Sequence, residues 1–208
     1  MTRHKIIASW TTVVIYWLRL TCGVKFKVLG KEFIESVDKP VVVLSKHQST
    51  WETLFLQSLF WPASTVLKKE LLNIPFFGWG LRALRPIGID RNNPREALKQ
   101  VKTKGINRLE SGLNFILFPE GTRMAAGERG TYARSGADIA LNTGSKILPV
   151  ALNAARCWPS NTFVKYPGEI TVSVGPIIHP EGKTSKEVIK EVEEWIEAEM
   201  LKIDQPVD

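Results

Sequence analysis

The 208-residue chain has few residues of the types that build disulfide frameworks and metal centres. It holds two cysteines, Cys22 and Cys157, and three histidines. Two cysteines at unrelated positions do not form a disulfide framework, and three histidines are too few for a metal cluster, so we expect a reducing compartment and no metal site. The chain also lacks internal repeats and linkers rich in Gly, Ser or Pro. This absence favours a single folded domain.

Long hydrophobic runs are absent as well. The longest uninterrupted apolar stretch lies within Ile6 to Leu20 and has about 13 residues, whereas a helix needs roughly 18 to 20 to span a bilayer. The run contains Trp10, Tyr16 and Trp17, whose rings favour the lipid headgroup level. We therefore predict that residues 1–25 form an amphipathic helix that associates with an anionic membrane surface.

Two alternatives remain open for this segment. The helix can pack on the core of its own domain, or it can form a tilted or hairpin membrane segment that extends to Leu29. No acidic residue occurs before Glu32. Acidic charge is thus missing where an anionic surface would repel it.

Basic residues outnumber acidic ones, with 28 Lys and Arg against 21 Asp and Glu, which gives a formal net charge of +7. Residues 181–208 hold nine acidic and four basic side chains, which leaves +12 on residues 1–180. A strongly basic body attracts phosphates, anionic lipids, nucleic acid or an acidic protein. Charge alone does not choose among these partners.

From residue 26 onward, short β-branched runs alternate with segments of helical period, the pattern of an α/β domain. We predict one domain over residues 26–208 with a mixed, largely parallel sheet of about seven strands flanked by helices. The expected strands are Phe26–Leu29, Val41–Leu44, Thr65–Leu67, Ile87–Ile89, Phe115–Phe118, Ile147–Leu152 and Thr171–Val174. The expected helices are Thr50–Phe60, Pro94–Ser111, Gly136–Asn142 and a last helix that begins at a Thr184–Glu187 capping box.

The first polar cluster follows the apolar strand that ends at Leu44. His47 lies at the strand exit and Glu52 lies in the first turn of the next helix, where α/β folds place their sites. A carboxylate there can hold one imidazole nitrogen and leave the other free to take a proton from a hydroxyl. The alternative is purely structural, because Ser49 and Glu52 also have the spacing of a capping box.

A second strand exit runs from Phe118 to Arg123, with the sequence Phe-Pro-Glu-Gly-Thr-Arg. Proline stops the strand, and glycine permits a tight turn. A guanidinium and turn amides are suitable donors to a phosphate. The alternative is a surface turn with a local ion pair between Glu120 and Arg123.

Taken together and in order, these blocks resemble the signatures of the glycerolipid acyltransferase family. That family has His, four residues and Asp in its first block, and here Glu52 stands in the place of the aspartate. The Phe118–Arg123 block matches in full. Three further stretches resemble family blocks, namely Lys68–Gly78, Gly88–Arg91 and Leu148–Val150, so that the similarity covers about residues 41–152.

The resemblance implies an enzyme of phospholipid biosynthesis that moves a fatty acyl group from a thioester to the free hydroxyl of 1-acylglycerol 3-phosphate, giving phosphatidic acid. His47 is then the general base and Glu52 orients it. The residues implied in substrate binding are Lys68, Arg91, Glu120, Gly121, Thr122 and Arg123.

The same resemblance implies acyl-CoA or acyl carrier protein as the donor, no other cofactor, no nucleic acid partner, and a place on the cytoplasmic face of the inner membrane. Two alternatives stay open. The acceptor can be glycerol 3-phosphate or a lyso-aminolipid, or the chain can be a non-catalytic basic module that binds anionic lipid or nucleic acid.

Overall fold

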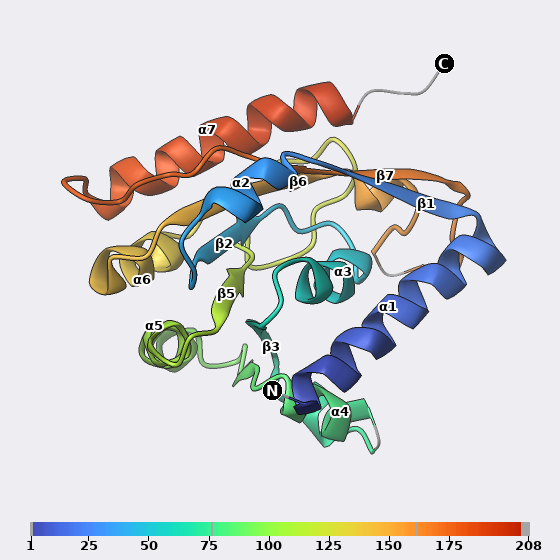
Figure 1. The fold of residues 1–208 in the computed structure, drawn as a ribbon, viewed down its shortest axis with the longest axis horizontal. Coiled ribbons are helices and arrows are strands. Elements are labelled where there is room, and N and C mark those ends of the chain that lie inside the picture. Colours follow the sequence, from blue (N-terminus) through green and yellow to red (C-terminus); the bar gives the residue numbers. More distant parts are fainter. Residues whose placement is uncertain (1, 76, 161, 205–208) are drawn as a thin grey trace.

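The computed structural model describes residues 2–75, 77–160 and 162–204, and in this part of the chain seven strands form one sheet (Figure 1). The strands are β1 (Val24–Leu29), β2 (Val42–Ser45), β3 (Ala63–Lys68), β4 (Ile87–Ile89), β5 (Asn114–Leu117), β6 (Ile147–Leu152) and β7 (Gly168–Val174). The prediction of a single α/β domain with about seven strands is confirmed.

The helices are α1 (Thr2–Cys22), α2 (Lys31–Ser36), α3 (Trp51–Leu59), α4 (Phe77–Ala83), α5 (Pro94–Glu110), α6 (Ser135–Thr143) and α7 (Ser185–Ile203), with 3-10 turns η1 (Lys69–Asn73) and η2 (Ala154–Arg156). The Thr184–Glu187 capping box at the start of α7 is confirmed, since both of its hydrogen bonds are present. The short elements α2, η1, α4 and η2 were not expected. Each has seven residues or fewer, too few to show a clear helical period.

The order of the strands across the sheet is β1-β7-β6-β2-β5-β3-β4. Strands β6, β2, β5, β3 and β4 run parallel to one another. Strand β7 pairs antiparallel to β6, and β1 pairs parallel to β7. The carboxyl ends of the five parallel strands therefore meet at one edge of the sheet, which we call the carboxyl edge.

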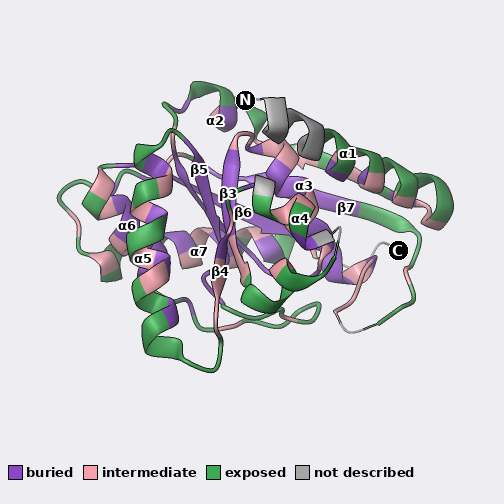
Figure 2. Ribbon diagram, turned by 90° about the horizontal axis from the view of Figure 1, so that it is seen from below, coloured by how far each residue is buried: buried purple, intermediate pink, exposed green. Residues whose placement is uncertain are grey.

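Helices cover both faces of the sheet, and strand residues alternate between the two. Val43 of β2 packs in a core under α1 and α3, whereas Val42 and Leu44 face a second core under α5, α6 and α7. Figure 1 shows α7 on one side of the sheet and α1 on the other. In Figure 2 the central strands are buried and the outer faces of the helices are exposed. This sandwich fixes the positions of the strand ends.

Helix α1 is present, and one of its faces packs on the domain. Ile15 is buried, and the Thr11 hydroxyl lies 2.8 Å from that of Ser58 on α3. The packing alternative left open by the sequence thus holds for this face. Strand β1 begins at Val24, within the predicted segment 1–25, because its backbone pairs with β7 from Gly168 onward. The boundary at residue 25 therefore falls inside a strand.

Candidate active site

The predicted site residues all lie at or just beyond the carboxyl edge. His47 follows β2, Arg123 follows β5, Lys68 ends β3 and Arg91 follows β4. These four strands are parallel. Sheet topology therefore brings together groups that are up to 76 positions apart in the sequence.

His47 and Glu52 form a buried pair. Nδ1 of His47 lies 2.9 Å from Oε1 of Glu52, and neither side chain is more than 8% exposed. A carboxylate accepts hydrogen bonds, so the imidazole proton lies on Nδ1 and the lone pair on Nε2. The pair has the arrangement of a general base with its orienting group.

Glu52 also supports the turn before its helix. The same Oε1 accepts the backbone N–H groups of Gln48, at 2.8 Å, and Ser49, at 2.6 Å. The Ser49 hydroxyl accepts the N–H of Trp51 instead of that of Glu52. Half of the capping-box alternative is thus realised. Glu52 caps the helix start and holds His47 with one oxygen atom.

The ring and backbone of His47 are fixed from further directions. The ring stacks on Phe118 with centroids 4.1 Å apart. The His47 N–H donates to Oε2 of Glu120 at 3.0 Å, and its carbonyl accepts the N–H of Met124 at 2.8 Å. The loop after β5 therefore clamps the turn after β2.

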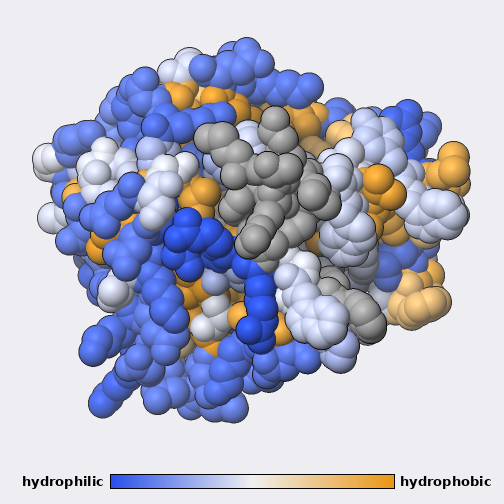
Figure 3. Space-filling model, turned by 60° about the horizontal axis from the view of Figure 1, so that its bottom comes forward, coloured by the Kyte–Doolittle hydropathy of each residue, from blue (hydrophilic) through white to orange (hydrophobic). Residues whose placement is uncertain are grey.

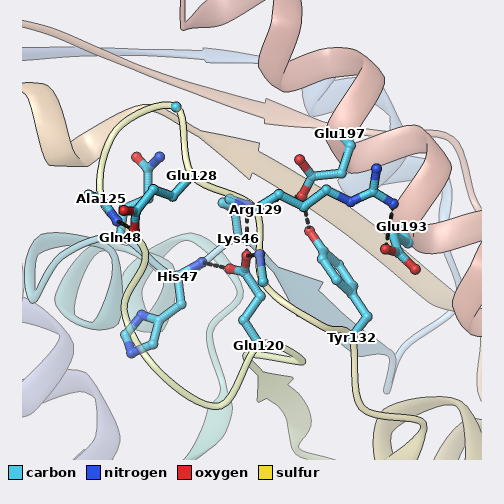
Figure 4. A network of polar contacts seen from close by, with 12 residues as sticks. Lys46, His47, Gln48, Glu120, Ala125, Glu128, Arg129, Tyr132, Glu193 and Glu197 are labelled. Atoms are coloured by element: carbon cyan, nitrogen blue, oxygen red, sulfur yellow. Dashed lines mark hydrogen bonds and ion pairs between the residues drawn. The ribbon is translucent and has the colours of Figure 1, made fainter.

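A buried ionic network lies behind this clamp (Figure 4). Nζ of Lys46 contacts Oε1 of Glu120 at 2.7 Å and Oε1 of Glu197, on α7, at 2.9 Å. Tyr132 donates its hydroxyl to Glu197 at 2.8 Å. Burial, and then the charges of Glu120 and Glu197, raise the pKa of Tyr132 far above its usual range, so that it stays a donor. Figure 4 shows the ring of His47 pointing away from this network.

This network bears on the expected role of Glu120. Glu120 was expected to bind substrate, but its side chain is fully buried. Its two oxygens accept from Lys46, from the N–H of Gly130 at 3.1 Å and from the N–H of His47. These protein donors occupy the carboxylate. The sequence also left open an ion pair between Glu120 and Arg123 on the surface. In the structure, Glu120 pairs with Lys46 instead.

The last three residues of the Phe118–Arg123 turn face outward. Gly121 has φ of +69°, a conformation that favours glycine, and its N–H closes the turn on the carbonyl of Phe118. Thr122 and Arg123 are exposed. An exposed hydroxyl and guanidinium next to a sharp turn are available to an anionic ligand.

Lys68 and Arg91 are also exposed. Between them, Lys69 pairs with Asp90 at 2.5 Å, and this hydrogen bond raises the pKa of Lys69 and lowers that of Asp90. Among the described residues, no hydrogen bond or ion pair joins Lys68, Arg91 or Arg123 to the His47–Glu52 pair. In the same part of the chain, no group of three or more His, Cys, Asp or Glu side chains is placed to hold a metal ion.

Sequence reasoning missed Lys46, Tyr132 and Glu197. Lys46 directly precedes His47 and is only 1% exposed. Glu197 borders the apolar stripe of α7 between Ile196 and Met200. A carboxylate beside an apolar stripe is usually solvated. Glu197 differs from such a residue only in its contact with Lys46, which lies 151 positions away in the sequence.

The outer face of α1 is apolar. Val13, Tyr16, Trp17 and Leu20 are each more than half exposed and line an open groove together with Arg19, Thr12 and Lys25. Figure 3 shows hydrophobic residues gathered at the right-hand end of the molecule, the end at which α1 terminates, while hydrophilic residues dominate at the left. Within the described residues, no helix combines the length and hydropathy that crossing a bilayer requires.

Comparisons with known proteins show what the chain is similar to. The Acyltransferase family model matches residues 25–153. The 1-acyl-sn-glycerol-3-phosphate acyltransferase of Pseudomonas aeruginosa is 44% identical over 201 residues, which are 95% of this chain and 77% of that protein. The chloroplastic 1-acyl-sn-glycerol-3-phosphate acyltransferase LPAT1 of Arabidopsis thaliana is 29% identical over 72% of this chain, which spans only 40% of the plant protein.

A solved structure extends the likeness to the fold. The crystal structure of the 1-acyl-sn-glycerophosphate (LPA) acyltransferase PlsC of Thermotoga maritima matches 99% of this chain and 81% of that chain, with a TM-score of 0.81 and 25% identity. The range of this chain that the family model matches includes His47, Glu52 and the Phe118–Arg123 turn. By sequence and fold, the chain belongs to the acyltransferase family.

Proposed function

We propose that the chain transfers a fatty acyl group from a thioester to the free hydroxyl of lysophosphatidic acid and so produces phosphatidic acid. The observation that carries the proposal is the 2.9 Å contact between His47 and Glu52 at the carboxyl edge. It leaves Nε2 of His47 available as a general base at the same edge of the sheet as the exposed cations Lys68, Arg91 and Arg123. The names of the Pseudomonas and Thermotoga relatives, which are 1-acylglycerol-3-phosphate acyltransferases, support the same acceptor.

The chemistry balances with the groups of this chain. Nε2 of His47 takes the proton of the acceptor hydroxyl as its oxygen attacks the thioester carbonyl carbon. The new C–O bond forms, the C–S bond then breaks, and the departing thiolate takes the proton back from the imidazolium. Glu52 stabilises that imidazolium. General-base catalysis contributes about 10²- to 10⁴-fold, so positioning of the two substrates must supply much of the remainder.

The phosphate of the acceptor is assigned to Arg123, Lys68 and Arg91. Their exposure beside the carboxyl edge supports this role, because a guanidinium or ammonium forms charge-assisted hydrogen bonds to phosphate oxygens. Gly121 and Thr122 shape the turn that presents Arg123. Glu120 acts from behind the turn, through the backbone of His47.

The donor in this proposal is a fatty acyl thioester of coenzyme A or of acyl carrier protein. Both carry phosphate, which suits the +12 charge of residues 1–180. The outer face of α1 binds an anionic membrane, since apolar side chains and Arg19 lie together there. The membrane is the inner membrane, approached from its cytoplasmic face.

Release of free thiol by the purified protein tests this function. With acyl-CoA or acyl carrier protein as donor, we expect thiol release with lysophosphatidic acid and little with glycerol 3-phosphate, a lyso-aminolipid or no acceptor. His47→Ala should lower the rate by at least about 100-fold in a protein of unchanged circular dichroism. A preference for another acceptor, activity without acceptor, or a folded and active His47→Ala variant would each contradict the proposal.

A further inference from the structure

Lys46 is among the largest fully buried side chains of the protein. Lysine is almost never fully buried unless a charged partner compensates the loss of hydration. Here two carboxylates compensate it, Glu120 from the loop after β5 and Glu197 from α7. The reaction scheme above uses neither Lys46 nor Glu197. The function of this charge cluster, which adjoins the general base, is therefore still unassigned.

The contacts form a continuous path from α7 to the general base. Glu197 holds Lys46, Lys46 holds Oε1 of Glu120, and Oε2 of Glu120 accepts the N–H of His47. The far end of the path is firmly placed, because neighbouring residues of α7, among them Ile196 and Met200, are buried in the core. The family match ends at residue 153, so that Glu197 lies outside it.

The charges on this path depend on one another. Lys46 carries one positive charge between two negative ones. Without Glu197, Lys46 would keep Glu120 but lose its anchor on α7. Without Lys46, the carboxylates of Glu120 and Glu197 would lose the cation that both contact, and their like charges would repel each other. Either change alters how Glu120 holds the His47 backbone.

We propose that Glu197 is a positioning residue for His47, acting through Lys46 and Glu120, so that α7 is part of the catalytic unit. The inference rests on the proposed role of His47 as the general base. Its physical basis is the sensitivity of catalysis to geometry, since a shift of about 1 Å at a reacting group can cost about 100-fold in rate.

Substitution of Glu197 tests the path directly. Glu197→Ala should lower kcat by about 10- to 100-fold and leave the KM of both substrates within about twofold. Glu197→Gln should lose less, because its amide oxygen can still accept from Lys46 and Tyr132. Melting temperature and circular dichroism give the folded fraction, to which kcat is normalised.

Glu193→Ala is the matched control. Glu193 lies one turn earlier than Glu197 on α7. It pairs at 2.6 Å with Arg129, which lies in the loop after β5, but this pair is partly exposed. Exposed ion pairs contribute little, and we expect kcat within about twofold of the parent. If Glu193→Ala costs as much as Glu197→Ala, general docking of the loop explains both losses and the proposal is wrong.

A double-mutant cycle adds a test of the charge path. Lys46→Met should cost more activity than Glu197→Gln. The double variant Lys46→Met/Glu197→Gln should be more active than Lys46→Met alone, since it removes one of the two carboxylates that would repel each other. If the loss of kcat in the double variant equals the product of the two single losses, Lys46 and Glu197 are not coupled and the proposal is wrong. If Lys46→Met does not fold, the comparison of Glu197→Ala with Glu193→Ala still decides.

The outcomes separate this inference from the proposed function. An active His47→Ala variant removes the general base and the inference with it. An inactive His47→Ala variant beside a fully active Glu197→Ala variant removes only the inference. A lower melting temperature of Glu197→Ala with unchanged kcat per folded molecule would assign the network to stability and would also overturn the proposal.

Discussion

At the residue scale, Glu52 shows how one side chain can serve structure and chemistry together. Its Oε1 accepts two backbone N–H groups and holds Nδ1 of His47. The side chain is fully buried, and burial of a polar group is costly unless it is hydrogen-bonded. The extra methylene relative to aspartate is accommodated, because Oε1 still reaches the imidazole. Capping and orientation are therefore compatible roles.

Glu52→Gln separates these two roles. The amide oxygen can still accept the N–H groups of Gln48 and Ser49, so the melting temperature should change little. The charge that stabilises the imidazolium is lost, and kcat should fall by about 10- to 100-fold. Thiol release measures kcat, and thermal unfolding of the same preparation measures the melting temperature. A lower melting temperature with unchanged turnover per folded molecule would leave Glu52 with the capping role alone.

The exposed cations give a second prediction at this scale. Arg123→Ala and Lys68→Ala should each raise the KM for lysophosphatidic acid by about 10- to 100-fold, because a charge-assisted contact to phosphate is lost. The KM for the acyl donor should change less. Lys99→Ala, an exposed cation on α5, is the control. An equal loss with an acceptor analogue that lacks phosphate would assign the two residues to another role.

At the scale of elements, close packing sets where helices lie on the sheet. A Cβ atom on Gly136 of α6 would lie 2.4 Å from Cδ2 of Leu44 on β2. Leu44 is fully buried, so it has little room to move away. The glycine thus lets α6 approach the strand that ends at the general base. By contrast, a Cβ atom on Gly80 of α4 would meet nothing within 4 Å.

Gly136→Ala should therefore destabilise the protein by about 1–3 kcal/mol through overpacking. The better helix propensity of alanine, about 1 kcal/mol at most, offsets only part of this loss. Gly80→Ala gains the same propensity without a clash and should be neutral or slightly stabilising. Denaturant unfolding of both variants measures the difference. If Gly136→Ala and Gly80→Ala have equal free energies of unfolding, Leu44 can move away from the added methyl group without cost.

At the scale of the whole molecule, α1 divides its two faces between the domain and its surroundings. Ile15 is buried against the core, whereas Trp17 and Leu20 are 63% and 82% exposed. Phe26 of β1 links the helix to the domain through ring contacts with Tyr16 and Phe55. Removal of the whole segment would uncover this core, so point substitutions are the better probe of membrane binding.

Leu20→Glu and Trp17→Glu should each weaken sedimentation with anionic liposomes by about tenfold or more. Burial of a large apolar side chain contributes about 1.5–3 kcal/mol, and the new charge opposes an anionic surface. Leu98→Glu, at an exposed apolar position of α5, should have little effect. High salt should reduce the binding of the parent protein. If both α1 variants bind liposomes as well as the parent protein does, the membrane contact lies on another surface.

The sequence by itself determined the elements that depend on neighbouring residues. Seven β-branched runs became the seven strands, and the Thr184–Glu187 box began α7. The His47–Glu52 pair was also predictable, because five positions span one strand exit and the first turn of a helix. Periodicity and turn chemistry act over such short distances, and a linear pattern contains them.

Tertiary structure alone decided the long-range partners. Glu120 meets Lys46 across 74 positions, and Glu197 meets it across 151. These contacts arise from the order of the strands and from the side of the sheet on which α7 packs. The face that α1 turns inward was decided in the same way. An isolated motif cannot encode such partners, because the free energy that selects them comes from burial of the whole core.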